Sequence, residues 1–495
     1  MNRISEVRGS LMYVCALAIA FGATSLLWGQ WQNPAIDTIT NTQIRKETTI
    51  QSLCLDDSDM VHLVWKDQIT GGWRVFYCTN SPAGIWGTPQ HVGDTMEVAF
   101  DPAMAWSSVV GEVFVVYEQN SDIYAAHGWG GSWQVEPIVA NAQLDCSPTI
   151  AIDGWGMPHA AWITDDPNTG QYKIAYASSY FAGPYLGWDV QTLTASDLGP
   201  FGTGASPFIA VTAEGVAHIV YRGGDYGNYH IHHAWNSVQG PTVWDYEVLY
   251  SGNLNDFSAS LVIEDDGDCH LAAAGNDGWG FPGRIYYLYK PSGQAWQQYE
   301  LASLSNSAAN PSMDIDPNGR PHVVWMETSG NMYTGNVYYS RKNTVGNWQV
   351  SSVIGTDHFT PSFGIDGEGY GHVACHTGGN TGLYDIYHVK SSGALSVDEG
   401  FRYPTGCPHA ATILKSCPNP FQTLTEITYS ISCYGRVTLG VYNSTGERIS
   451  VLADGLMAPG VHSVRWHPGE LSAGTYFIRL VAGGSERNTK CVFLP

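Results

Sequence analysis

The sequence predicts an all-β chain in which a seven-bladed β-propeller is followed by a small β-sandwich. The main observation is an internal repeat that runs from residue 50 to residue 390: D-x-x-G-x-x-H-v-v-W, a variable loop, an I-Y-Y-like run and G-x-W. A repeat of about fifty residues with four short alternating runs is the pattern of a propeller blade. The composition agrees, because 12% aromatic residues, 56 glycines and only 14% charged residues suit short strands joined by tight turns.

Seven copies of the repeat align on one histidine column. Its members are His62, Phe114 in the place of a histidine, His159, His218, His270, His322 and His372. In the third copy the four strands are expected at residues 150–153, 159–162 and 174–177 and from Trp188 onward. The tryptophan that opens the fourth strand recurs at Trp86, Trp133, Trp244, Trp296 and Trp348, but none follows Lys390.

The fourth strand that the seventh copy lacks is expected from the N-terminal part of the chain. Residues 31–36, W-Q-N-P-A-I, resemble residues 133–138, W-Q-V-E-P-I, where a fourth strand opens. We therefore expect a propeller over residues 31–400, with residues 31–40 completing the last blade. Closing the ring in this way leaves no open blade at the seam.

Residues 1–30 have the pattern of a secretory signal peptide, because Arg3 and Arg8 precede an apolar run over residues 11–28. An uncleaved membrane anchor is the alternative, and no later segment is long and apolar enough to span a bilayer. The net charge of −23 argues against nucleic acid and anionic membrane surfaces as partners. It is compatible with cation binding or with solubility alone.

The ten cysteines contain no C-x-x-C pair, which argues against a zinc site. An oxidising compartment permits disulfides without requiring them. The candidate pairs are Cys433 with Cys491 and Cys407 with Cys417.

A second module follows a linker at residues 401–415 that is rich in small and turn-forming residues. Residues 416–495 contain short alternating runs separated by turn signals, such as S-T-G at residues 444–446 and P-G at residues 459–460. About 80 residues with six or seven short strands predict a small β-sandwich.

The order of motifs in this module carries a resemblance to a known family. The motifs are N-P-F, I-x-Y-x-I, V-x-L-x-V-Y-x-x-x-G-x-x-I, P-G-x-H-x-V-x-W and S-A-G-T-Y-F-I-R-L. The module resembles the C-terminal sorting domain of type IX secretion substrates and the related immunoglobulin-like domain of flagellar hook-capping proteins. The matching residues are Asn419, Pro420, Phe421, Tyr442, Gly446, Gly460, His462, Trp466, Gly474, Tyr476 and Phe477. The resemblance implies an immunoglobulin-like sandwich, a type IX-like secretion machinery as partner, and a secreted or outer-cell-surface location.

The turns between third and fourth strands carry a second resemblance. Residues 81–86, 292–296 and 344–348 resemble degenerate Asp-boxes of the sialidase-like propeller superfamily, in which the box is a fold-stabilising turn. Sialidases of that superfamily use three arginines on a carboxylate, a Tyr–Glu pair and an Asp acid. This propeller has few arginines and no Arg-Ile-Pro near its start, so the resemblance bears on fold more than on activity.

The histidine column and the acidic turn column are interpreted as structural. The column histidines stand one per blade around a ring and cannot converge on one metal ion, so we expect them to hydrogen-bond the turn or the neighbouring strand. The acidic residues before them supply turn geometry. A structural calcium ion at the acidic run 264–268 is the alternative, and otherwise no metal or cofactor is expected.

Candidate ligand-contacting residues follow the second strands and start the third strands of the blades. Because flat aromatics beside carboxylates and arginines suit sugar rings, the candidate ligand-binding residues are Trp73, Tyr172, Tyr226, Tyr229, Trp279, Arg284, Tyr333 and His376. The candidate catalytic residues are Glu118, Glu327, Arg222 and His230. Glu118 and Glu327 suit acid–base hydrolysis if they lie about 5 to 10 Å apart, and Arg222 with Tyr229 or His230 suits a lyase.

These observations favour a non-catalytic secreted or cell-surface protein that binds a glycan or another extracellular protein. The first alternative is a sialidase-like glycosidase or a polysaccharide lyase on the same propeller. The second is a structural surface-layer component.

Overall fold

The structure is a computed structural model, and it divides into two units, the first ending at Leu395 and the second beginning at Ser396. The residues outside the described part are 1–30, 32–34, 41–44, 82, 94–96, 130–131, 142, 183–184, 194–197, 199–205, 226–227, 238–239, 251–257, 265–266, 277–282, 304–306, 329–334, 343–347, 355–357, 379–383, 396–410, 432–434, 444–447, 458–459, 470, 483–484 and 495. The expected signal peptide therefore lies outside the described residues. No helix among the described residues is long and apolar enough to cross a membrane.

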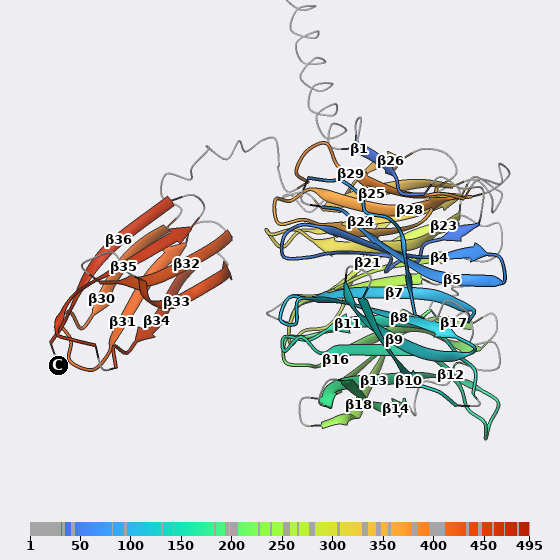
Figure 1. Ribbon diagram of the computed structural model, residues 1–495, viewed down its shortest axis with the longest axis horizontal. Coiled ribbons are helices and arrows are strands. Elements are labelled where there is room, and N and C mark those ends of the chain that lie inside the picture. The colour runs from blue at the N-terminus through green and yellow to red at the C-terminus, as the bar shows by residue number, and fades with distance from the viewer. Residues whose placement is uncertain are drawn as a thin grey trace, which may run out of the picture. The chain divides into compact units, whose positions relative to one another are not determined.

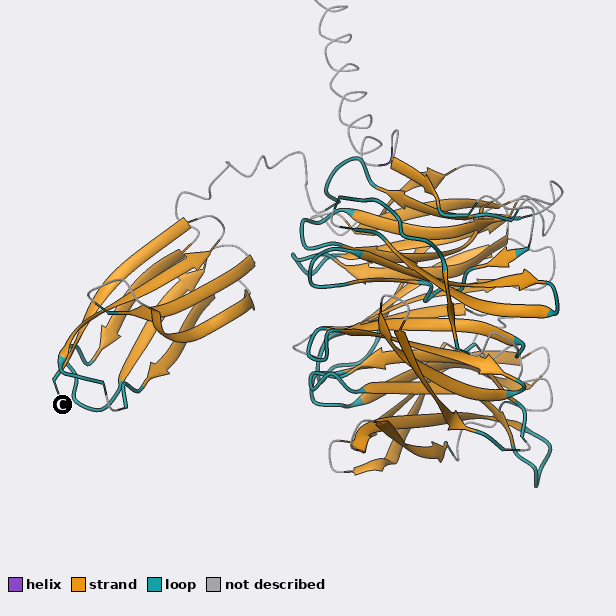
Figure 2. Ribbon diagram, viewed as in Figure 1, coloured by secondary structure: helices purple, strands orange, loops and turns teal. Residues whose placement is uncertain are grey.

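The first unit consists of seven antiparallel sheets, which are the blades of a propeller (Figures 1 and 2). Blade 1 contains β2 (Lys46–Glu47), β3 (Leu53–Leu55), β4 (Val61–Ile69), β5 (Gly72–Thr79) and β6 (Gln90–Val92); blade 2 contains β7 (Ala99–Ser107), β8 (Glu112–Gln119), β9 (Asp122–Trp129) and β10 (Ser132–Val139). Blade 3 contains β11 (Asp145–Ile152), β12 (Pro158–Asp165), β13 (Tyr172–Ala182) and β14 (Tyr185–Thr192); blade 4 contains β15 (Phe208–Val211), β16 (Ala217–Asp225), β17 (Asn228–Ser237) and β18 (Gly240–Tyr250). Blade 5 contains β19 (Ser258–Ile263), β20 (Cys269–Asn276), β21 (Gly283–Lys290) and β22 (Gln297–Ser303); blade 6 contains β23 (Ser307–Ile315), β24 (Pro321–Thr328), β25 (Gly335–Lys342) and β26 (Trp348–Ile354). Blade 7 contains β27 (His358–Ile365), β28 (Gly371–Thr377), β29 (Ile386–Lys390) and β1 (Ala35–Thr38).

The blades follow one another around a ring. The innermost strands β7, β11, β15, β19, β23 and β27 contact one another in sequence, and β27 and β7 both contact β3 of blade 1. The predicted all-β propeller is confirmed.

The N-terminal strand forms the outer edge of blade 7. Strand β1 pairs antiparallel with β29, with Ala35 opposite Lys390 and Thr38 opposite Tyr387 (Figure 1). Trp31, just before it, is buried against Tyr339 of blade 6 at a ring-centroid distance of 5.6 Å. The last blade is thus built from both ends of the propeller sequence.

The column histidines belong to a repeated chain of side-chain contacts. In blade 3, Nδ1 of His159 lies 2.6 Å from the Tyr176 hydroxyl and Nε2 lies 3.2 Å from Asp153, the acid that ends the inner strand. The same histidine–tyrosine contact joins His62 to Tyr77, His270 to Tyr287 and His322 to Tyr339 at 2.6 to 2.7 Å. In blade 7, His372 contacts Asp366 and His388 at 3.0 Å each. The interpretation of these histidines as hydrogen-bonding groups is confirmed.

At several blade boundaries a tryptophan of the following blade packs on this chain of contacts. The ring pairs are Trp133 on Tyr77, Trp244 on Tyr176, Trp296 on His233, Trp348 on Tyr287 and Trp86 on His388, at centroid distances of 4.9 to 5.5 Å. Trp31 on Tyr339 is the corresponding contact between blade 7 and blade 6. Three indoles also donate across the blade boundary, Trp86 to Asp37, Trp244 to Gln191 and Trp296 to Glu247. We call these inter-blade contacts the tryptophan clasps.

A short segment of blade 1, residues 48–52, reaches the inner strands of other blades, and we call it the central segment. It separates β2 from β3, which both pair with β4. The amide of Gln51 donates to the Ile150 carbonyl of blade 3 (3.1 Å), and the hydroxyl of Thr49 donates to the Pro102 carbonyl of blade 2 (2.8 Å). On the other side Thr48 donates to Thr360 of blade 7 (2.8 Å), and Ile50 packs against the apolar core of blades 4 and 5. The central segment therefore ties the inner strands of distant blades together.

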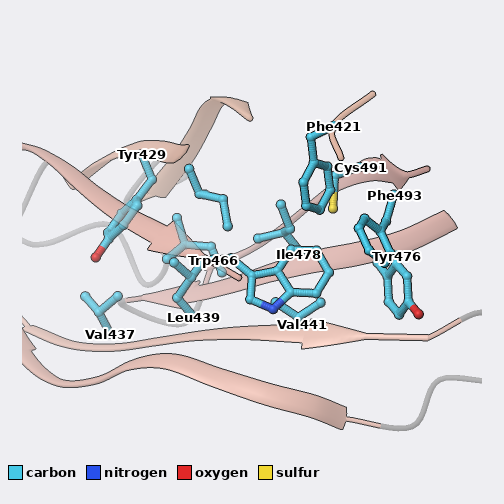
Figure 3. Close-up of a cluster of buried hydrophobic side chains, with 12 residues drawn as sticks. Phe421, Tyr429, Val437, Leu439, Val441, Trp466, Tyr476, Ile478, Cys491 and Phe493 are labelled. Carbon is cyan, nitrogen blue, oxygen red and sulfur yellow. The ribbon is translucent and has the colours of Figure 1, made fainter. Parts of the chain in front are cut away.

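The second unit is a two-layer β-sandwich. One sheet is β30 (Ala411–Cys417), β31 (Thr425–Ile431) and β34 (Gly460–Trp466); the other is β33 (Arg448–Met457), β32 (Gly435–Tyr442), β35 (Gly474–Ala482) and β36 (Ser485–Phe493). Phe421, Trp466, Tyr476 and Phe493 pack between the sheets (Figure 3). Asn419 fixes the last strand, since it donates to the Lys490 carbonyl and accepts from the Val492 amide.

Two sequence-based expectations for this unit need correction. Strand β30 begins at Ala411, so residues 411–415 pair with β31 instead of belonging to the linker, because their backbone groups complete the smaller sheet. Cys491 is a buried free thiol in the core of the sandwich, not one half of a disulfide. Cys407 and Cys433 lie outside the described residues.

We expect Trp31→Ala to destabilise the propeller by about 3–5 kcal/mol, the usual cost of truncating a buried tryptophan. The loss follows from opening the clasp on Tyr339 and from weakening the docking of β1. Urea unfolding of the full chain measures it. Trp155→Ala, at a tryptophan that is 62% exposed, is the matched control and is expected to change stability by less than about 0.5 kcal/mol. Equal effects of the two substitutions would contradict the role assigned to Trp31.

We expect the propeller to lose stability as the pH falls below about 6.5. Burial lowers the pKa of His322 and His388, and burial together with the charge of His233 lowers the pKa of His218 to about 3. The folded state keeps these rings neutral while the unfolded chain gains protons, so their contribution is complete above pH 6.5 and declines toward the lower folded pKa. Urea unfolding between pH 7.5 and pH 4.5 measures the slope.

His218→Phe provides a control for this pH dependence. Blade 2 already has Phe114 at the corresponding position, stacked on His127 at 5.4 Å. The variant should fold, and its stability should vary less with pH than that of the unchanged protein. An identical pH profile would contradict the contribution of His218.

Candidate functional site

One end of the propeller is formed by the starts of the inner strands and the ends of the second strands, and we call this end the mouth. Several inner strands begin there with an X-Pro pair whose first residue has a positive φ. These residues are Asp101 (φ 44°), Ser147 (55°), Ser206 (41°), Asn310 (52°) and Thr360 (44°). Positive φ is strained for a residue other than glycine and commonly marks a functional or bulged position. The β7–β8 ladder shifts register at Asp101, between Phe100 and Ala103.

A group of charged and aromatic side chains from blades 1 and 2 gathers at the mouth. We call it the mouth cluster; its members are Arg45, Glu47, Lys66, Trp73, Phe100, Asp101 and Glu118. Nζ of Lys66 lies 2.8 Å from Asp101 and 3.0 Å from Glu47, and Nη2 of Arg45 lies 2.5 Å from Glu47. Both cations lie 5.4 Å from the centre of the Trp73 ring.

The ion pairs set the charges of the cluster. Burial acts to raise the pKa of Glu47, but Lys66, Arg45 and His376 outweigh it and hold that pKa below its usual value. Burial acts to lower the pKa of Lys66, but Asp101 and Glu47 outweigh it and raise that pKa. Lys66 and Glu47 therefore stay ionised beside Trp73.

Glu118 differs from its neighbours because none of the described groups hydrogen-bonds to its carboxyl. It stands opposite Phe100 in the β7–β8 ladder and is half-buried. Burial raises its pKa to about 7, and the charges of Asp101 and Asp145 act in the same direction against Lys66. Glu118 is thus a carboxyl group that exchanges a proton near neutral pH.

His376 supports the cluster from blade 7 and belongs to the fold. Its Nδ1 accepts a hydrogen bond from the Thr48 amide at 3.1 Å, and its ring stacks on Phe359 at 5.8 Å. Burial lowers its pKa to about 4, so the ring is neutral and acts as an acceptor for the central segment. His376 is buried, so its ring is not exposed for the ligand contact that the sequence predicts.

The other predicted site residues that the structure describes lie in blades 3 to 6. Glu327 is buried in blade 6, Arg284 lies in blade 5 within 3.5 Å of the Tyr286 hydroxyl, and Tyr172 packs against the core of blades 3 and 4. In blade 4, Arg222 stands opposite Ile231 while His230 stands opposite Gly223. Because neighbouring residues of a strand point to opposite faces, this register separates Arg222 from His230. Four further predicted positions cannot be placed in this way, because they lie outside the described part of the structure: Tyr226, Trp279, Tyr333 and the side chain of Tyr229.

Trp73 and Glu118 are therefore the predicted residues that the structure brings together. Arg45, Glu47, Phe100 and Asp101 were missed by the sequence reasoning. Arg45 and Glu47 precede the repeat, so its pattern does not reveal them. The X-Pro pair that recurs at the starts of inner strands is the signal that marks Asp101.

Among the described residues no group of three or more His, Cys, Asp or Glu side chains has a metal-binding arrangement. At the acidic run 264–268, Glu264 contacts His270 at 2.7 Å and Asp268 accepts from the Ser292 amide at 2.7 Å. These carboxylates thus serve the turn and its neighbours.

Comparisons with known proteins gave fold-level similarity only. No family model and no curated protein matches the chain. A solved protein of unknown function from Dyadobacter fermentans matches at 13% identity and a TM-score of 0.44, over 60% of this chain and 95% of that one. An oligogalacturonate lyase in complex with manganese matches at 10% identity and a TM-score of 0.47, over 72% and 93%. An α-L-arabinofuranosidase of Fusarium graminearum with arabinobiose matches at 10% identity and a TM-score of 0.39, over 59% and 92%. Similarity at this level bears on neither substrate nor activity.

Lys66→Met is expected to raise the pKa of both Glu47 and Glu118, because the lysine charge lowers each of them. Infrared titration of the carboxyl bands measures the two pKa values. The variants Glu47→Gln and Glu118→Gln identify which band belongs to which residue. Lys173→Met, which removes the partner of Asp166 in blade 3, is the control and should leave both groups unchanged. No movement of the Glu118 band in Lys66→Met would contradict the described electrostatics.

Proposed function

We propose that this protein binds glycans, with the mouth cluster as the sugar site. The observation that carries the proposal is Trp73, whose ring centre lies 5.4 Å from each of two cations that are themselves held by Glu47 and Asp101. An aromatic face beside fixed polar groups is the arrangement that binds a sugar ring, by stacking and by hydrogen bonds to its hydroxyls.

The strands make this site rigid. Trp73 lies in β5, Phe100 lies in β7 with its ring 6.5 Å from Trp73, and Lys66 lies in β4. Side chains held by strands and by ion pairs lose little freedom when a ligand binds, which favours affinity.

The charges favour a neutral sugar. Arg45 is paired with Glu47, and Lys66 is shared by Glu47 and Asp101. A sialic acid or a uronate requires a cation for its carboxylate, and here both cations are already engaged by carboxylates. The cluster therefore supports a neutral hexose or pentose ligand better than the acidic sugars that the sialidase and lyase alternatives need.

We also propose that the protein is secreted or held at the outer cell surface. The support is the N-terminal signal pattern and the resemblance of the C-terminal module to type IX sorting domains. In that module the motif residues Asn419 and Phe421 fasten the last strand, and Trp466 and Tyr476 fill the core. The secretion machinery would then be a partner of this unit.

Trp73→Ala is expected to weaken binding of neutral glycans by about five- to tenfold, because aromatic stacking contributes about 1–1.5 kcal/mol. A glycan array with the full chain identifies the ligands, and calorimetry on those ligands measures the loss. Trp155→Ala, at an exposed tryptophan outside the mouth, is the control and should bind normally. Unchanged binding by Trp73→Ala, or binding confined to acidic glycans or to proteins, would contradict the proposal.

A further inference from the structure

We infer that the mouth hydrolyses the glycan that it binds, with Glu118 as the general acid and Asp101 as the carboxylate that takes a proton from the attacking water. This inference rests on the proposed function, because the same cluster must first hold the sugar. It concerns residues that lie beside the aromatic pair Trp73 and Phe100.

The backbone brings the two carboxyl groups to one place. Glu118 stands opposite Phe100, and Asp101 is the next residue after Phe100, at the strained bulge with φ 44°. Oδ1 of Asp101 lies 2.8 Å from Nζ of Lys66, which fixes its position at the mouth. Nζ of Lys66 also lies 5.4 Å from the centre of the Trp73 ring and 6.0 Å from that of Phe100, so Asp101 and the aromatic pair surround the same ammonium group.

The two groups have opposite environments, as an acid and a base require. Asp101 accepts a hydrogen bond from the Lys66 ammonium at 2.8 Å. Glu118 has no such partner among the described residues, and burial with the nearby charges of Asp101 and Asp145 disfavours its ionised form. With its pKa raised to about 7, Glu118 therefore retains a proton that it can donate near neutral pH.

A further buried carboxylate borders the same place. Asp145, at the start of β11, is 1% exposed, and its Oδ1 accepts from the Trp162 indole at 2.7 Å. None of the described groups donates to its buried Oδ2. Its charge acts on Glu118 and on the neighbouring thiol of Cys146.

The reaction balances with water as the only co-reactant. Glu118 gives its proton to the glycosidic oxygen as the bond to the anomeric carbon breaks and its electron pair passes to that oxygen. Water adds to the anomeric carbon and loses a proton to Asp101. The products are a hemiacetal and an alcohol, and the proton on Asp101 returns to Glu118 through solvent. Direct attack by water inverts the anomeric configuration.

A cavity of about 490 Å³ at the opposite end of the blades is lined by Asp37, Asp59, Asp366, Glu368, His388 and Lys390, among others. Its Asp37 accepts from Trp86, and its Asp366 contacts His372 and Lys390 at 3.0 Å each, so these groups serve the seam between blades 7 and 1.

The test uses the full chain and the neutral glycans that bind it on the array. Released reducing ends are measured by chromatography and calorimetry measures affinity. We expect turnover by the unchanged protein, a loss of about 100-fold or more in Glu118→Gln with binding retained, and a similar loss in Asp101→Asn. Glu112→Gln, at the other end of β8, is the matched control and should keep both binding and turnover. The rate of the unchanged protein should fall above about pH 7, as Glu118 loses its proton.

The outcomes separate the two proposals. Binding without turnover overturns hydrolysis and leaves glycan binding in place, whereas absence of binding overturns both. Turnover that survives Glu118→Gln overturns the role of Glu118. Proton NMR of the first-formed product reports its anomer, and retention of configuration would overturn water activation by Asp101.

Discussion

The packing of one tryptophan on the histidine-bound ring of the preceding blade is the interaction on which the propeller depends. In blade 3, for example, Asp153 contacts His159, His159 contacts Tyr176, and Tyr176 receives Trp244 of blade 4. Each clasp therefore joins a turn of one blade to the last strand of the next. Trp31 supplies this contact where blade 7 meets blade 6.

The centre of the ring determines where chemistry can occur. The central segment fastens inner strands of several blades through Gln51 and Thr48. The residues just before it, Arg45 and Glu47, thereby come to lie beside Trp73 and Lys66. The same stretch of chain therefore serves both the fold and the site. The central segment stabilises the ring of blades, and the residues just before it place polar groups beside Trp73.

The repeat alone was sufficient to predict the blades, the tryptophan column and the closing strand, because each arises from local periodicity. The site was only partly predictable. Trp73 and Glu118 were found from their place at strand ends, whereas Arg45 and Glu47 arrive from outside the repeat through long-range contacts. The burial of Glu327 and the opposite orientations of Arg222 and His230 depend on register and packing, which a sequence pattern does not specify.

The decisive experiment is a crystal structure of the full chain with a bound neutral oligosaccharide. We expect a sugar ring stacked on Trp73, with hydroxyls on Asp101 and the glycosidic oxygen within hydrogen-bond reach of Glu118. A sugar bound on another blade, or at the opposite end of the propeller, with the mouth cluster untouched would contradict it.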